Sequence, residues 1–296
     1  MTRVLVTGAG GFVGRHVVHA APVAWDVVAL SRGPAPADTQ RRWVEWPAPD
    51  LLPVEISASP YDAVIHLAGN ADHGLAVREP WRDLEATAVL GASLLGRIDA
   101  ARVVLLSSAA VYAGLDGLVS PETPVDPPMP YALSKLYVEG FVRSRVASGH
   151  AGSAAIIRLY NAFGPGERPT RLVPRVVDAI RSGSPFRLIG SPDSLSDPVF
   201  IYDVVSTLLA AASDNANGTW DLCGGDPRPL TEQVGRIARA IGGQPPQVEE
   251  VPDPTQTPIH FYSDPHPLAE AFGAALPRPF ETGVREYADE MGWTGS

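Results

Sequence analysis

The chain's single lysine lies one helical turn after a tyrosine. Of 23 lysine and arginine residues, only Lys135 is a lysine, and it closes the segment Tyr131–Lys135 (YALSK). Side chains four residues apart share one face of a helix. A nearby cation favours ionisation of a phenol, whose pKa is otherwise about 10. Lysine also supplies a compact charge that can donate to ribose hydroxyls. The pair predicts a proton-transferring Tyr131 assisted by Lys135.

Two serines are candidates for holding the substrate oxygen. Ser107 and Ser108 follow the apolar run Arg102–Leu106, and residues just past the carboxyl ends of parallel strands line the ligand crevice. A hydroxyl there can bind a substrate oxygen while Tyr131 moves its proton. No histidine is placed to activate either serine as a nucleophile. His66 stands in a buried-strand context, which favours a packed core residue over a base.

A glycine-rich loop opens the chain. Thr7–Gly14 (TGAGGFVG) lies between an apolar strand-like run and a helix-like segment. Gly8 permits a tight turn, Gly11 lets backbone N–H groups approach a pyrophosphate, and Gly14 lets helix and strand pack closely. The Gly-Lys-Ser/Thr ending of a P-loop is missing, so nucleotide hydrolysis is disfavoured. The pattern predicts a dinucleotide site whose loop contacts are Gly8, Gly11, Phe12, Val13 and Gly14.

The end of the second strand bears on which dinucleotide binds. Cofactors with a free ribose 2′-hydroxyl usually meet an acidic residue there. Here the sequence reads Leu30-Ser31-Arg32, without a carboxylate. Ser31 and Arg32 favour the 2′-phosphate of NADP, with NAD as the alternative.

The periodicity predicts the elements that position these residues. Short apolar runs indicate parallel strands at Arg3–Thr7, Val27–Leu30, Ala63–Leu67, Arg102–Leu106 and Ala154–Leu159. Intervening helices are expected at Gly14–Ala21, Trp81–Ile98 and Tyr131–Val146. The fold class is therefore α/β, a doubly wound parallel Rossmann sheet over residues 1–165.

The C-terminal part has a different texture, with proline-rich loops. Helices are expected at Leu172–Arg181, Tyr202–Ala212, Thr231–Ile241 and Phe280–Met291. Their scatter predicts a small, mostly helical substrate-binding cap over residues 166–296. Segments around 196–225 are expected to return to the Rossmann domain.

Bulk composition excludes several classes. The 296 residues carry a net charge of −10, which argues against binding to nucleic acid. With 45% hydrophobic and 19% charged residues, the chain can bury a large core. No apolar run approaches the ~18 residues of a membrane span. Cys223 is the only cysteine, so an internal disulfide and a cysteine-cluster metal site are excluded. We expect a soluble, cytoplasmic protein that acts on a small molecule without a metal.

Motifs in series carry a family resemblance over nearly the whole chain. After the glycine loop come Asp50-Leu51, Asp62–Gly69 (DAVIHLAG), Ser108–Tyr112 (SAAVY), Tyr131–Lys135, Arg158–Pro165 (RLYNAFGP) and Asp197–Asp203 (DPVFIYD). Together and in this order they resemble the extended short-chain dehydrogenase/reductase family, also called the NAD-dependent epimerase/dehydratase family.

The resemblance implies roles for individual residues. Ser108, rather than Ser107, forms a catalytic triad with Tyr131 and Lys135, which also contact the cofactor. Asp50 and Leu51 contact adenine, and the dinucleotide is lined by Leu67, Ala68 and Gly69. Asn161 contacts the substrate, expected to be a nucleotide sugar. A homodimer is also implied, formed through the helices at Trp81–Ile98 and Tyr131–Val146.

Two departures from the family pattern bear on the reaction. Family members that remove water from nucleotide sugars carry an Asp-Glu pair where this chain has Ala109 and Ala110, which disfavours 4,6-dehydration. Ser196 stands where an arginine often binds the diphosphate. Arg168 or Arg171 is the candidate to replace it.

Three functions are weighed. The leading hypothesis is an NAD(P)-dependent 4-ketoreductase of a nucleotide sugar, favoured by Ser31 and Arg32. The alternative is a nucleotide-sugar C4 epimerase with tightly bound NAD, favoured by the SAAVY motif. A catalytically silent dinucleotide sensor is the third. It is disfavoured because none of Ser108, Tyr131 and Lys135 has been lost.

Overall fold

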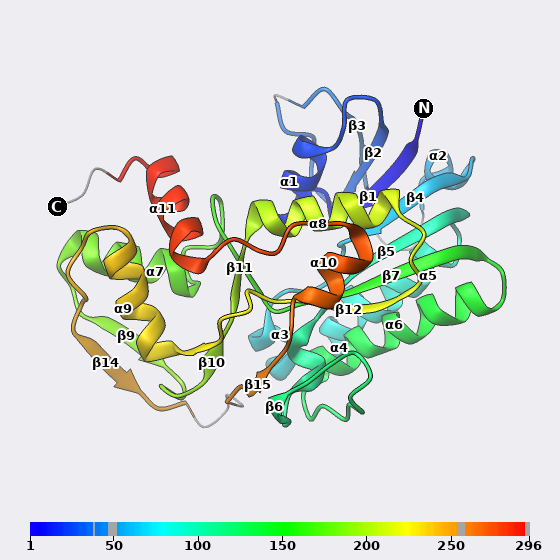
Figure 1. The fold of residues 1–296 in the computed structure, drawn as a ribbon. Helices are drawn as coiled ribbons and strands as arrows, with labels where there is room; N and C mark the ends of the chain where they lie inside the picture. The colour runs from blue at the N-terminus through cyan, green and yellow to red at the C-terminus, as the bar shows by residue number, and fades with distance from the viewer. Residues whose placement is uncertain (38, 47–51, 254–257, 294–296) are drawn as a thin grey trace.

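A parallel sheet with helices on both faces forms one side of the molecule, on the right in Figure 1. The computed structural model describes residues 1–37, 39–46, 52–253 and 258–293, and within them seven strands pair in the order β12-β7-β5-β4-β1-β2-β3. Every pairing in this sheet is parallel. The strands are β1 (Arg3–Thr7), β2 (Asp26–Ser31), β3 (Arg42–Glu45), β4 (Tyr61–His66), β5 (Ala100–Ser108), β7 (Ala151–Leu159) and β12 (Gly218–Leu222). The predicted fold class is confirmed.

Successive residues of the strands serve two separate cores. Val4 and Val6 of β1 belong to one buried cluster, and Leu5 between them belongs to the other. Side chains alternate across a strand, so an unbroken apolar run supplies both faces. This explains why continuous apolar runs correctly predicted five strands of the sheet. β3 and β12 were not predicted, because polar residues such as Glu45 and Asp221 interrupt their apolar runs.

Helices cover both faces of the sheet. On one face, α1 (Phe12–Ala20) packs beside α8 (Ile201–Ser213), with Val17 and Leu208 in the core. On the other face, α5 (Leu90–Leu95) packs beside α6 (Pro130–Ala147), with Leu94 and Val138 in the core. Within the described residues no helix is both long enough and apolar enough to cross a membrane.

The helix expected at Trp81–Ile98 is not uniform. It consists of α4 (Pro80–Leu84), a π-helical turn at Glu85–Val89 and α5, and it ends at Leu95. The π turn holds Thr87, whose buried Oγ1 accepts a hydrogen bond from the Asn70 N–H at 3.0 Å. The irregular turn thus contacts the loop that follows β4, and π turns are frequent near functional sites.

Short elements precede and follow these helices. Before α4 lie α2 (Val54–Ser57) and α3 (His73–Arg78), and a 3₁₀ turn at Ala109–Tyr112 follows β5. The C-terminal helices are α7 (Leu172–Ser182), α9 (Leu230–Ala240), α10 (His266–Phe272) and α11 (Phe280–Glu290).

Short strand pairs accompany the C-terminal helices, an addition to the mostly helical expectation. The parallel pairs are β6 (Asp116–Leu118) with β15 (His260–Tyr262), β8 (Asn161–Phe163) with β11 (Pro198–Phe200), and β9 (Phe186–Ile189) with β14 (Val248–Val251). An antiparallel pair joins β10 (Leu195–Ser196) to β13 (Arg228–Pro229). β12 continues from α8 to the edge of the main sheet beside β7.

The strand order sets the position of the cleft. From β1 the chain proceeds outward to β2 and β3 and then returns to β4 on the other side of β1. The loops after β1 and β4 therefore diverge, which opens a crevice at their carboxyl ends. A cleft of about 2130 Å³ lies there, lined both by these loops and by residues of the C-terminal part.

Candidate active site

The glycine loop is shaped by backbone contacts that exclude side chains. Gly8 has φ +69°, and a Cβ on it would lie 2.8 Å from the Ala68 backbone nitrogen. A Cβ on Gly14 would overlap the Gly8 carbonyl oxygen, because α1 packs directly against the end of β1. Gly11 closes the turn by donating its N–H to the Gly8 carbonyl at 2.9 Å. The bare backbone of this loop faces the cleft and fits a dinucleotide pyrophosphate.

Tyr131 and Lys135 lie one turn apart near the start of α6. Both line the cleft, although only 7% and 8% of their surfaces are exposed. The Lys135 Nζ lies 5.8 Å from the centroid of the Tyr131 ring and donates to the Leu106 carbonyl at 3.5 Å. A Cβ on Gly69 would lie 3.5 Å from this Nζ, so the loop after β4 approaches the ammonium closely. The ammonium thus lies between the phenol and the dinucleotide loops.

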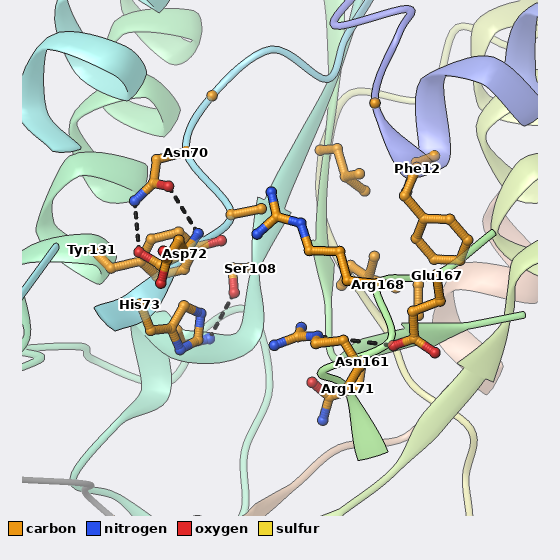
Figure 2. Close-up of a pocket in the computed structure, with 18 of the residues that line it drawn as sticks. Phe12, Asn70, Asp72, His73, Ser108, Tyr131, Asn161, Glu167, Arg168 and Arg171 are labelled. Atoms are coloured by element: carbon orange, nitrogen blue, oxygen red, sulfur yellow. Dashed lines mark hydrogen bonds and ion pairs between the residues drawn. The ribbon is translucent and has the colours of Figure 1, made fainter. Parts of the chain in front are cut away.

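The two serines at the end of β5 have different surroundings. The Ser107 hydroxyl is buried and donates to Glu139 Oε1 at 2.6 Å. Ser108 is half-buried at the cleft, and its Oγ accepts the Ala110 N–H at 3.2 Å, which caps the 3₁₀ turn (Figure 2). The structure therefore brings Ser108, Tyr131 and Lys135 to one cleft and gives Ser107 a structural partner.

A buried polar network supports these residues from below. Arg158 donates to both carboxylate oxygens of Glu139, at 3.0 and 2.8 Å, and to the Tyr112 hydroxyl at 2.8 Å. The Tyr112 hydroxyl in turn donates to Asp221 at 2.9 Å. Burial raises the pKa of Asp221 to about 6. The network ties α6, β5, β7 and β12 together beneath the cleft.

His66 is a core residue, as expected. It is 1% exposed, and its Nδ1 lies 2.9 Å from the Thr7 hydroxyl. Burial, assisted by the charge of Lys135, lowers the pKa of His66 to about 3. The ring is therefore neutral in the working pH range.

Most of the predicted cofactor residues line the cleft. Phe12, Val13, Leu67, Ala68 and Gly69 all line the cleft, as do Ser31 and Arg32. The Ser31 hydroxyl accepts the Gly33 N–H at 3.4 Å and lies beside Gly10. Arg32 is exposed, and its side chain has no hydrogen-bond or ion-pair partner in the described part of the chain. Asp50 and Leu51 lie outside the described residues.

The opposite wall of the cleft carries the predicted substrate residues. Asn161, Arg168 and Arg171 line it, and the two arginines extend across the cleft toward Ser108 and Tyr131 (Figure 2). Ser196 also lines the cleft, on β10. The structure thus places two cations opposite the candidate catalytic residues. Position 196, which is a serine, contributes no positive charge to the cleft.

Glu167 is a site residue that the sequence reading missed. Its side chain is 7% exposed, and its Oε1 lies 3.8 Å from Arg171 Nε. Its other oxygen, Oε2, is buried without a hydrogen-bond partner among the described residues. Burial raises the pKa of Glu167 to about 8. The acidic residue after Gly-Pro-Gly was the available signal, but its burial depends on tertiary packing.

His73 and its neighbours were also missed. Asn70, Asp72 and His73 follow β4 and line the cleft. The Asp72 carboxylate accepts the Leu75 N–H at 3.1 Å and so caps α3. The Asn70 side-chain amide donates to the Asp72 carbonyl and accepts the Asp72 N–H, both at 2.8 Å (Figure 2). Polar residues just past a parallel strand are the signal that could have identified them.

A buried carboxylate connects this loop to the catalytic helix. Asp83 is fully buried on α4 and accepts hydrogen bonds from Asn70 Nδ2 at 2.8 Å and from the Ser134 hydroxyl at 2.7 Å. Ser134 directly precedes Lys135. Within the described residues no group of three or more His, Cys, Asp or Glu side chains could hold a metal ion.

The fold and cleft define a dinucleotide-binding α/β oxidoreductase. A model described as "NAD dependent epimerase/dehydratase family" matches residues 4–223, and the chain belongs to this family. The resemblance inferred from the motifs is therefore confirmed. Members are NAD-dependent enzymes, and the family binds dinucleotides of the NAD(P)H type.

Individual relatives include both dehydratases and epimerases. A dTDP-glucose 4,6-dehydratase of Mycolicibacterium smegmatis is 26% identical, with 97% of this chain and 92% of that protein covered. A UDP-glucose 4-epimerase of Azospirillum brasilense is 32% identical, over 60% of this chain and 55% of that protein. The solved structure of MoeE5 in complex with UDP-glucose and NAD superposes with a TM-score of 0.86 at 25% identity, covering 98% of both chains.

Proposed function

We propose that this chain is a nucleotide-sugar 4-epimerase that uses a bound nicotinamide dinucleotide. The observation that carries the proposal is the grouping of Ser108, Tyr131 and Lys135 in one cleft beside the glycine loop, with Ala109 and Ala110 next to Ser108. This grouping can remove and return a proton on a sugar hydroxyl. The alanines provide no carboxyl group to assist loss of water.

The side chains have distinct roles in this proposal. Ser108 holds the C4 oxygen, and Tyr131 takes its proton as the alcohol becomes a ketone. Lys135 stabilises the phenolate and binds the nicotinamide ribose. The dinucleotide, when bound, supplies hydride acceptance and return at C4. The epimer would form if the 4-keto sugar turned in the cleft before hydride returned to the opposite face of C4, with Tyr131 giving the proton back to the C4 oxygen.

The dinucleotide and the nucleotide sugar occupy the two halves of the cleft. Residues 1–165, together with about 196–225, form the dinucleotide half, and the remaining C-terminal residues form the substrate half. Arg168 and Arg171 neutralise the sugar nucleotide's diphosphate in place of an arginine at position 196, and Asn161 contacts the sugar. MoeE5, whose solved complex contains UDP-glucose and NAD, supports this class of ligand.

A 4-ketoreductase is the second candidate, and Ser31 with Arg32 favours it. Arg32 is exposed directly after β2, where the ribose 2′-phosphate of NADPH would lie. The end of β2 lacks the acidic residue that usually binds the ribose 2′-hydroxyl of NAD. A reductase would exchange its cofactor at each turnover, whereas an epimerase retains it. The sequence alone ranked the reductase first. The epimerase ranks above it here because MoeE5 contains NAD and because relatives include a UDP-glucose 4-epimerase.

We further propose a homodimer formed through α4 and α6. Both helices expose large apolar side chains, namely Trp81 and Leu84 on α4 and Leu133 and Tyr137 on α6. Exposed apolar side chains grouped on packed helices mark an association surface.

The reaction is tested with the purified protein and UDP- and dTDP-hexoses labelled with deuterium at C4. An epimerase releases stoichiometric NAD on denaturation and forms the C4 epimer with the deuterium retained. NADPH consumption with 4-keto sugars and no epimer would instead establish the reductase. Tyr131→Phe should lower the rate about 10²–10⁴-fold, whereas Tyr137→Phe, an exposed tyrosine on the same helix, should not. Full activity of Tyr131→Phe would refute the mechanism.

A further inference from the structure

The His73 imidazole lies against the Tyr131 ring. Their ring centroids are 4.2 Å apart with an interplanar angle of 39°. His73 is the first residue of α3 and is exposed within the cleft, on the same side as Tyr131 and Ser108 (Figure 2). This ring contact places the imidazole beside the group proposed to act on C4.

The polar atoms of His73 are unused by the protein. Neither ring nitrogen has a hydrogen-bond or ion-pair partner among residues 1–37, 39–46, 52–253 and 258–293. Neighbouring cleft groups are already engaged, since Asp72 caps α3 and Asn70 binds Asp83. Imidazole nitrogens in a polar cleft are therefore available to a ligand.

The charges around His73 determine which ligand group it suits. Partial desolvation inside the cleft lowers the pKa of His73, and the cations Arg171 and Lys135 lower it further, while Asp72 and Asp83 oppose them. The ring is thus neutral near pH 7 and offers one N–H donor and one nitrogen acceptor. A hydroxyl group matches this pair. The anionic parts of a nucleotide sugar are better matched by Arg168 and Arg171.

We propose that His73 is a specificity-determining residue that binds a free hydroxyl flanking C4 of the sugar. The inference rests on the proposed function, because it takes Tyr131 as the group that binds the C4 oxygen. In a pyranose, the substituents on C3 and C5 lie on either side of the C4 oxygen. The imidazole lies beside the phenol that binds this oxygen, so it lies near one of these substituents. The flanking hydroxyl is therefore the one on C3 or the one on C6.

The test measures binding as well as turnover. The parent ligand is the nucleotide sugar that binds most tightly in the panel described above, and it is compared with its 3-deoxy and 6-deoxy analogues by calorimetry on the dinucleotide-loaded protein. His73→Phe keeps a stacking ring and removes both nitrogens. His73→Asn and His73→Gln restore an amide near the position of one nitrogen each. His19→Phe, at an exposed histidine on α1, is the matched control.

We expect His73→Phe to weaken parent binding about tenfold, the size of one lost hydrogen bond. The same change should leave binding unaltered for the one analogue that lacks the partner hydroxyl, and His73→Asn or His73→Gln should recover part of the loss. Equal losses on the parent and both analogues would show a merely structural ring and overturn the inference. So would unchanged binding of the parent.

The binding arm separates this inference from the proposed function. If the coupling between His73 and one hydroxyl appears without epimerisation, the inference holds and the epimerase proposal fails. If the protein epimerises but the losses are uniform, only the inference fails. Failure of every nucleotide sugar in the panel to bind overturns both.

Discussion

At the scale of single residues, Glu167 has an ionisation that the folded protein disfavours. Its side chain is almost fully buried and holds one carboxylate oxygen without a hydrogen bond among the described residues. Burial outweighs the attraction of Arg171, so the pKa rises from 4.5 to about 8. In the unfolded chain the same carboxyl loses its proton near pH 4.5.

This shift predicts a pH dependence of stability. Between about pH 4.5 and 8 the folded state binds a proton that the unfolded state has released, so the free energy of unfolding falls as pH rises. Glu167→Gln removes this contribution, which is at most about 1.4 kcal/mol per pH unit. Urea unfolding of both proteins from pH 5 to 8 measures the effect. The free energy of unfolding of the variant should exceed that of the wild-type protein by an amount that grows with pH. Parallel curves for the two proteins would contradict the prediction, and exposed Glu250→Gln is the control.

Two neighbouring serines have different surroundings. Ser107 and Ser108 are adjacent in sequence, but strand alternation turns one toward Glu139 and the other toward the cleft. Because α6 packs against β5, Glu139 of α6 lies on the side of the strand to which Ser107 points, and Ser108 stays available at the cleft.

At the scale of elements, one ion pair holds α6 to β7. Glu139 is fully buried, and the Arg158 side chain is 4% exposed and bonds both of its oxygens. Arg143 also reaches Glu139 at 3.0 Å, but its side chain is 49% exposed. Removing one partner of a buried pair leaves an uncompensated charge, whereas a solvated partner contributes little.

Arg158→Met should therefore lower the free energy of unfolding by about 3–5 kcal/mol. Arg143→Ala should cost less than about 1 kcal/mol. Adding Glu139→Leu to Arg158→Met should recover part of the loss, because Glu139 is then no longer an unpaired buried charge, while the buried Ser107 hydroxyl loses its acceptor. Urea denaturation followed by circular dichroism compares the three variants. Equal effects of Arg158→Met and Arg143→Ala would refute the distinction between the two pairs.

At the scale of the whole molecule, α4 and α6 provide the surface proposed for the homodimer. Leu133 and Tyr137 are 52% and 54% exposed, one turn apart on α6, and Trp81 on α4 is 55% exposed. The same helix carries Tyr131 and Lys135 on its opposite, cleft-facing side. Association would therefore cover the outside of α6 and, through Trp81, extend to the edge of the cleft.

Charges on this surface should dissociate the dimer. The double variant Leu133→Glu/Tyr137→Glu is expected to be a monomer where the wild-type protein is a dimer. The introduced carboxylates would lose water in the interface and would face the same carboxylates of the partner subunit. Size-exclusion chromatography with light scattering measures the mass. Val23→Glu, at an 89% exposed apolar position before β2, should leave the dimer intact. A monomeric wild type would refute the proposed association.

Features that depend on local spacing could be predicted from the amino-acid order. The glycine loop, the Tyr131–Lys135 pair and the apolar runs of the strands all express short-range rules, such as a four-residue helical repeat or an unbroken apolar strand. These rules predicted the fold class, and the motifs predicted the family, without knowledge of any contact. The π turn at Glu85–Val89 was not foreseen, because the same apolar pattern suits an uninterrupted helix.

Contacts between side chains that are distant in sequence depend on the tertiary fold. His73 reaches Tyr131 because the strand order places the loop after β4 beside the start of α6. Glu167 is buried because the loop that precedes α7 closes one wall of the cleft. Stacking and desolvation act between residues brought together by sheet topology and packing. Local periodicity carries no information about such pairs. The motifs therefore indicated the reaction class, and the structure identified His73, the side chain proposed to select the sugar.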